Sequence, residues 1–199
     1  MFTPSATRLA ACATVGFTAA AVAGSLWTVR DWAASWPLLG FYTLLLINTF
    51  FSIRCFSSIA PRQTVAQIVT DCALVALYVY LAFQFANVAR FLWVSVMLFL
   101  VAILRHALML HTPGYVKLLT RKMLLNLLAA AGCGAALVGV AVGLPQSLVW
   151  WLGGFLLANI YILLMSKMYY PIADEARQQT EVAGFSDGDA RFVPSEHPR

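Results

Sequence analysis

One aspartate stands apart from the other acidic residues of the chain. Six of the eight acids lie in the last 26 residues, and Asp31 lies between two apolar runs. Asp71 instead lies roughly 10 Å inside the apolar run 64–86, at 1.5 Å per helical residue. A carboxylate at that depth is costly unless it is paired, hydrated or protonated. Its chemistry is therefore ion pairing or the binding of a proton or cation.

Further polar residues recur at helical spacing in the apolar runs. Gln67 and Tyr78 are four residues before and seven after Asp71, so the three share one helical face. Asn48 and Ser52 share a face of the preceding run. Together with asparagines of the last two runs they form a candidate polar path: Asp71, Gln67, Tyr78, Asn48, Ser52, Asn126 and Asn159.

Two arginines, Arg54 and Arg105, lie at a depth similar to that of Asp71 and are its candidate ion-pair partners. Two interpretations of Asp71 stay open. In the first, an ion pair fixes the packing of neighbouring helices. In the second, the carboxylate binds a proton or cation, or forms part of a solute path.

Residue patterns of known membrane enzymes are missing. The apolar runs contain no GxS tripeptide, no Arg-Pro with Ser-Gly-His, and no pair of carboxylates for acid–base or metal chemistry. The four cysteines lack CxxC spacing and are expected to pack as small residues. His106 is expected in an interface or loop role. We therefore expect no enzyme, no catalytic residue, no metal site and no cofactor.

The elements that must position these residues are membrane-spanning helices. The sequence is 61% hydrophobic and 11% charged, against about 25% charged residues in soluble domains. Apolar runs of about 20 residues predict an all-α bundle of six transmembrane helices. Their expected ranges are 9–29, 37–59, 64–86, 89–111, 118–143 and 147–170. Residues 1–171 form the expected membrane domain, and 172–199 a polar cytoplasmic tail.

Charge and aromatic residues predict the orientation. With the N-terminus inside, eleven of the 13 Lys and Arg residues fall on the cytoplasmic side and only Arg30 and Arg90 fall outside. The six tryptophans then all fall at the outer interface. This predicts a multi-pass protein of the inner (plasma) membrane with both termini in the cytoplasm.

Small residues at four-residue spacing predict close helix packing. Gly16, Ala20 and Gly24 form such a stripe in the first run. Ala131, Ala135, Gly139 and Gly143 form another in the fifth run. Because small residues let helices approach closely in lipid, these two helices are expected to be central.

Two functional hypotheses follow. The first is a small transporter or channel-like protein with its polar path around Asp71. The second is a non-catalytic membrane subunit or assembly factor in which Asp71 forms a structural ion pair. The expected partners are the lipid bilayer and either another membrane protein or further copies of the chain. Nucleic acid is not expected, because the basic residues lie singly at the ends of apolar runs.

Overall fold

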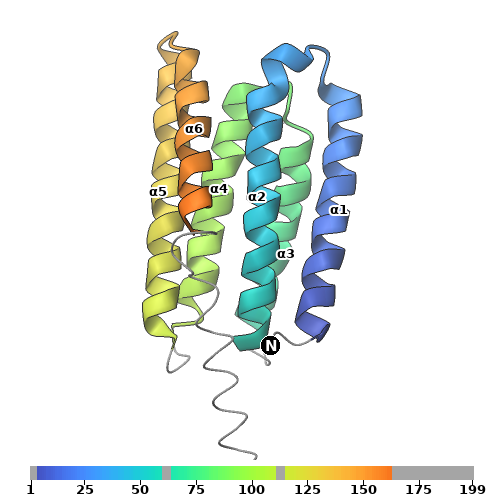
Figure 1. Cartoon of the computed structure of the whole chain (residues 1–199), viewed down its shortest axis with the longest axis vertical. Helices are drawn as coiled ribbons and strands as arrows, with labels where there is room; N and C mark the ends of the chain where they lie inside the picture. Colours follow the sequence, from blue (N-terminus) through green and yellow to red (C-terminus); the bar gives the residue numbers. More distant parts are fainter. Residues whose placement is uncertain (1–3, 60–63, 111–114, 163–199) are drawn as a thin grey trace, which may run out of the picture.

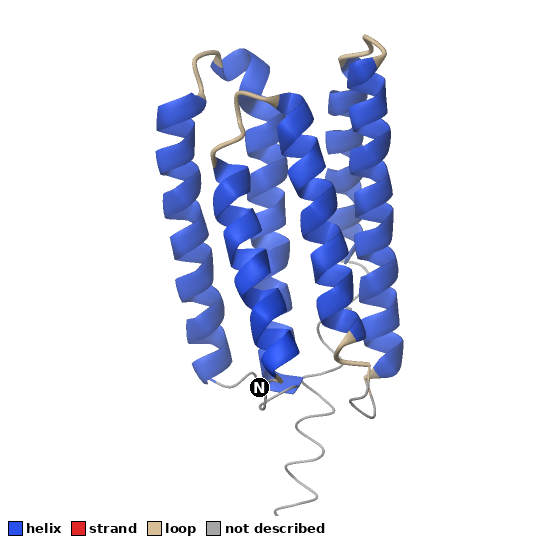
Figure 2. Ribbon diagram, turned by 180° about the vertical axis from the view of Figure 1, so that it is seen from behind, coloured by secondary structure: helices blue, strands red, loops and turns tan. Residues whose placement is uncertain are grey.

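The computed structural model describes residues 4–59, 64–110 and 115–162, and these residues form helices and connections without a strand (Figure 2). The six helices are α1 Pro4–Thr28, α2 Trp32–Ile59, α3 Val65–Ala82, α4 Val88–Ala107, α5 Val116–Ala141 and α6 Gln146–Ile160. The all-helical prediction is confirmed. Polar caps begin several helices; Thr64 and Gln67, for example, form a reciprocal capping box at the start of α3.

Five of these helices, α1 to α5, are long and apolar enough to cross a membrane. The sixth, α6, is apolar and extends over 15 residues. The later part of the expected span 147–170 and the expected tail 172–199 lie outside the described residues. The molecule is thus consistent with a multi-pass membrane protein.

The helices form a ring in which each has two principal neighbours. The contacting pairs are α1–α2, α2–α6, α6–α5, α5–α4, α4–α3 and α3–α1. In Figure 1, α2 and α6 lie in front, α3 and α4 behind, and α5 and α1 at the two sides. Residues from non-adjacent helices can therefore face one another across the centre of the ring.

The second helix begins five residues earlier than the sequence predicted. The segment from Asp31 to Pro37 was expected to be a connection, but α2 begins at Trp32 and contains Pro37. The Asp31 carboxylate accepts hydrogen bonds from the backbone N–H groups of Ala33 and Ala34, at 2.9 and 3.2 Å. Because the Asp31 side chain satisfies two orphan donors, the helix begins directly after it, at Trp32, and tolerates a proline in its first turns.

The prediction that α1 and α5 are central is wrong. Both lie on the ring, on opposite sides of the bundle (Figure 1). Only part of the small-residue stripe of α1 lies in a close helix contact. A Cβ atom at Gly24 would overlap the Ala82 backbone of α3, whereas a Cβ atom at Gly16 would have no neighbour within 4 Å. Small residues thus permit the contact at Gly24 but do not by themselves specify a central position.

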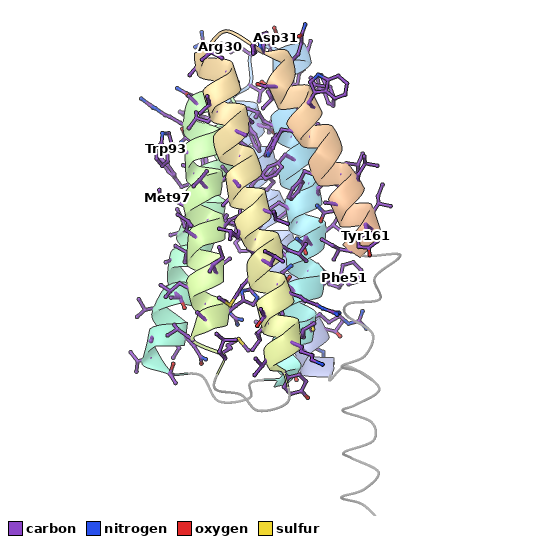
Figure 3. All side chains as sticks on the ribbon, turned by 90° about the vertical axis from the view of Figure 1, so that its left-hand side faces the viewer. Arg30, Asp31, Phe51, Trp93, Met97 and Tyr161 are labelled. Atoms are coloured by element: carbon purple, nitrogen blue, oxygen red, sulfur yellow. The ribbon has the colours of Figure 1, made fainter. Side chains whose placement is uncertain are left out.

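Tryptophans gather at the end of the bundle that carries the α1–α2, α3–α4 and α5–α6 connections. We call it the tryptophan end; it holds Trp27, Trp32, Trp36, Trp93, Trp150 and Trp151. In Figure 3, Arg30 and Asp31 mark this end, and Trp93 points away from α4. Trp93 is 54% exposed, as expected of a ring at a membrane interface. The opposite end, where α1 begins, is called the N-terminal end.

An aromatic cluster fills the ring between its centre and the tryptophan end. Phe41 of α2 is fully buried. Its ring centroid lies 4.2 to 6.3 Å from those of four other rings: Phe91 and Phe99 of α4, and Trp151 and Phe155 of α6. Such rings combine a large buried apolar area with edge-to-face attraction. The cluster joins three helices, α2, α4 and α6.

Candidate functional site

Two adjoining cavities lie among the helices. The first has a volume of about 260 Å³ and is lined by residues of α1 to α5. The second has a volume of about 320 Å³ and is lined by residues of α2, α4, α5 and α6, together with Ile162. Four residues line both cavities, and we call them the shared wall: Asn48, Phe99, Lys122 and Asn126. Together the two cavities touch all six helices.

An ion pair between α3 and α4 lies on the wall of the first cavity. Arg105 Nε donates to Asp71 Oδ1 at 2.6 Å, and Arg105 Nη1 contacts Met109 Sδ at 3.1 Å. The side chains of Arg105 and Asp71 are 17% and 32% exposed, respectively. Arg105 is one of the two partners expected for Asp71; Arg54, the other, is half-buried on α2 and lines neither cavity. The pair is therefore partly open to the first cavity.

A buried lysine forms part of the shared wall. Lys122 is only 3% exposed, and its Nζ donates to Asn48 Oδ1 at 2.9 Å. From the sequence, Lys122 was predicted as one of the cytoplasmic positive charges and not as a member of the polar path. The sequence nevertheless indicated that Lys122 could belong to the polar path, because it lies inside the expected span 118–143 and four residues before Asn126. That spacing puts both side chains on the buried face of α5.

Two buried asparagines carry polar atoms without a hydrogen bond to any described residue. Asn126 is 5% exposed, and its Nδ2 has no such partner. Asn159 is 3% exposed; its Nδ2 donates to the Phe155 carbonyl at 2.9 Å, while its Oδ1 has no such partner. Asn126 lines both cavities and Asn159 lines the second. An unsatisfied buried amide loses the hydrogen bonds it makes in water, so a bound molecule that satisfied these atoms would gain affinity.

Hydroxyl groups line the side of the first cavity nearest to α1. The Tyr78 hydroxyl is hydrogen-bonded to the Thr49 hydroxyl, and the Tyr78 ring stacks on Phe17. Ser52 also lines this cavity, one turn after Asn48. The Tyr42 hydroxyl donates to the carbonyl oxygens of Phe17 and Tyr78. These contacts tie α1, α2 and α3 together around the polar region.

Gln67 lies away from both cavities. Its side-chain oxygen accepts from the Thr64 backbone N–H at 2.9 Å, and its Nε2 donates to the Leu108 carbonyl at 3.5 Å. Gln67 shares a face with Asp71, as expected, but it lies one turn nearer the N-terminal end. Its side chain therefore caps α3 and contacts the end of α4, while the other six residues of the expected path line a cavity.

His106 lies inside the bundle rather than in an interface or loop position. It is 4% exposed, it packs edge-on against Phe56, and its Nδ1 is hydrogen-bonded to the Ala102 carbonyl. Because a carbonyl only accepts, Nδ1 carries the proton, and in the neutral ring Nε2 is an acceptor. Nε2 has no hydrogen bond to another described residue. His106 thus adds an acceptor to the lining of the first cavity.

The arrangement offers polar side chains for a ligand. Among the described residues, no group of three or more His, Cys, Asp or Glu side chains could hold a metal ion. The described residues of the cavity linings combine the Asp71–Arg105 ion pair, Lys122, the His106 ring, and neutral amides and hydroxyls within an apolar wall. This chemistry suits reversible binding of a small polar molecule.

Comparisons of the chain with protein-family models, with curated proteins and with solved structures gave no match.

Proposed function

We propose that the protein is a small transporter or channel-like protein of the inner membrane, with a polar intramembrane path through the two cavities. The observation that carries this proposal is the shared wall, where Asn48, Lys122 and Asn126 are polar and border both cavities. Polar and ionisable residues inside a membrane are energetically unfavourable, and they commonly mark a solute or ion pathway. Asp71 and Arg105 would form the polar wall of the first cavity on this path.

The proposed orientation has both termini in the cytoplasm. It is supported by the excess of Lys and Arg at one side of the expected spans and by the tryptophans at the other. The cavities would then be reached from the cytoplasmic side, because Asp71 and Arg105 lie within about two turns of the N-terminal end. The aromatic cluster around Phe41 would close the path toward the tryptophan end.

A flux measurement tests the proposal. Purified protein would be reconstituted in vesicles of phosphatidylethanolamine and phosphatidylglycerol, and permeation of sodium lactate, methylammonium chloride and glycerol would be followed by osmotic swelling. We expect at least one probe to enter faster than in protein-free vesicles. Asn126→Leu should remove the increase, because it replaces a polar group of the shared wall by an apolar one.

Thr120→Leu is the matched control, because Thr120 lies on the exposed face of the same helix, α5. It should retain the flux of the unmodified protein. Equal permeation of all three probes with and without correctly folded protein would reject the path. An increased flux that Asn126→Leu does not reduce would also reject the path.

The second candidate is a non-catalytic membrane subunit or assembly factor. The observation that favours it is the 2.6 Å ion pair, because Asp71 and Arg105 connect α3 to α4 within the chain. On this reading the pair stabilises the bundle, and a partner protein or another copy of the chain contacts its outer surface. Co-purification of a stable partner together with absence of flux would favour this candidate.

A further inference from the structure

The described residues place three charged side chains around the two cavities: Asp71, Arg105 and Lys122. Asp71 and Arg105 pair with each other and line the first cavity only. Among the described residues that line the second cavity, the charged one is Lys122. Since charge in a low-dielectric site acts strongly on a bound group, this cavity favours a ligand with a negative charge.

Hydrogen-bonding groups of two kinds meet in the second cavity. Lys122 is a cationic donor, and the buried Asn126 Nδ2 is a donor without a described partner. Asn159 Oδ1 is a buried acceptor without a described partner. A ligand that matches this set has an anionic oxygen to accept from Lys122 and Asn126, and a separate O–H to donate to Asn159.

We propose that the second cavity binds a small hydroxycarboxylic acid in its anionic form. Its carboxylate accepts hydrogen bonds from Lys122 Nζ and Asn126 Nδ2, and its hydroxyl donates to Asn159 Oδ1. This inference rests on the proposed function, for which it names the class of solute. The cavity volume of about 320 Å³ is close to the lower limit of about 300 Å³ for ligand pockets, which agrees with a small molecule.

Binding can be measured without transport. Purified protein in lipid-free maltoside detergent would be unfolded thermally at near-neutral pH, with unfolding followed by tryptophan fluorescence. Sodium L-lactate, sodium propionate and sodium chloride would be added at equal ionic strength. We expect lactate to raise Tm by several degrees, because a ligand of the native state stabilises it by mass action. Propionate, which lacks the hydroxyl, should raise it less, and chloride should leave it unchanged.

Matched variants identify the groups responsible. Lys122→Met should weaken lactate binding by at least about tenfold, the lower range for a hydrogen bond to a charged group. Lys117→Met, an exposed lysine of the same helix, should leave it unchanged. Asn159→Leu should remove the preference for lactate over propionate. Asn126→Leu removes a donor without changing a charge, and it should weaken lactate binding even if Lys122→Met fails to fold.

The outcomes separate this inference from the transport proposal. Lactate binding that depends on Lys122 or Asn126 supports the inference even if the vesicles show no flux. Absence of a lactate-induced shift overturns it, even if another probe permeates. A shift produced equally by chloride, or by added phosphatidylglycerol in place of lactate, also overturns it, because the site would then accept any anion or a lipid headgroup.

Discussion

Asp71→Asn is expected to lower the stability of the bundle by about 2 kcal/mol and to reduce transport at least about tenfold. The stability estimate lies between about 1 kcal/mol for exposed ion pairs and about 3–5 kcal/mol for buried pairs that lose one partner, because Asp71 is 32% exposed. Without the carboxylate, the Arg105 guanidinium loses its 2.6 Å partner. Thermal unfolding and vesicle flux would measure the two effects.

A double variant separates the structural role of the pair from its role in the path. Asp71→Asn with Arg105→Gln removes both charges, so it should recover much of the lost stability. It should not recover transport if the pair lines the path. Recovery of stability and activity together would instead favour the subunit or assembly-factor candidate. Asp31→Asn is the control, because Asp31 lies at the tryptophan end and asparagine caps helices equally well.

Phe41→Ala should cost about 3 kcal/mol of stability, the lower part of the range for removing a buried aromatic side chain. Phe41 is fully buried and contacts rings of α4 and α6, so its removal leaves a cavity where three helices meet. The midpoint of thermal unfolding in detergent would report the loss.

The control for this variant is Phe83→Ala. Phe83 lies at the end of α3 and is 40% exposed, so its truncation should have a much smaller effect. Equal losses of stability for the two variants would mean that the aromatic cluster does not hold the ring together.

Much of the helical architecture could be predicted from the sequence, because each span needs a continuous apolar run. The start of α2 could not be predicted from Pro37 alone, since the Asp31 cap decides where that helix begins. The ring order also could not be predicted, because a short connection does not decide which helices pack together. The helices α2 and α3 follow one another in the chain but are not principal neighbours, whereas α1–α3 and α2–α6 are. Those contacts depend on side-chain packing across the bundle.

The part of the candidate site that could be predicted is the part in which helical spacing alone places residues on the same face of one helix. Asp71 and Tyr78 share a face in the structure, as their spacing of seven implied, and both line the first cavity. Lys122 was not predicted as a site residue, because a lysine near the end of a span is equally consistent with a position at the cytoplasmic interface and with a buried position. Its contact with Asn48 joins residues 74 positions apart, and no local pattern encodes such a pair.

If the polar cavities form a path, water and solutes reach them, and thiol labelling can detect this access. With the four native cysteines replaced by alanine, Ser52→Cys would report on the first cavity and Ser95→Cys on the buried interior of α4. Ser52 lines that cavity, whereas Ser95 is fully buried and lines neither cavity. A membrane-impermeant maleimide would be added to each face of membrane vesicles in turn.

We expect Ser52→Cys to react with reagent added to the cytoplasmic face, and Ser95→Cys to react from neither face. If Ser52→Cys stays unmodified from both faces, or if the two variants react equally, the cavities do not form a path open to solutes.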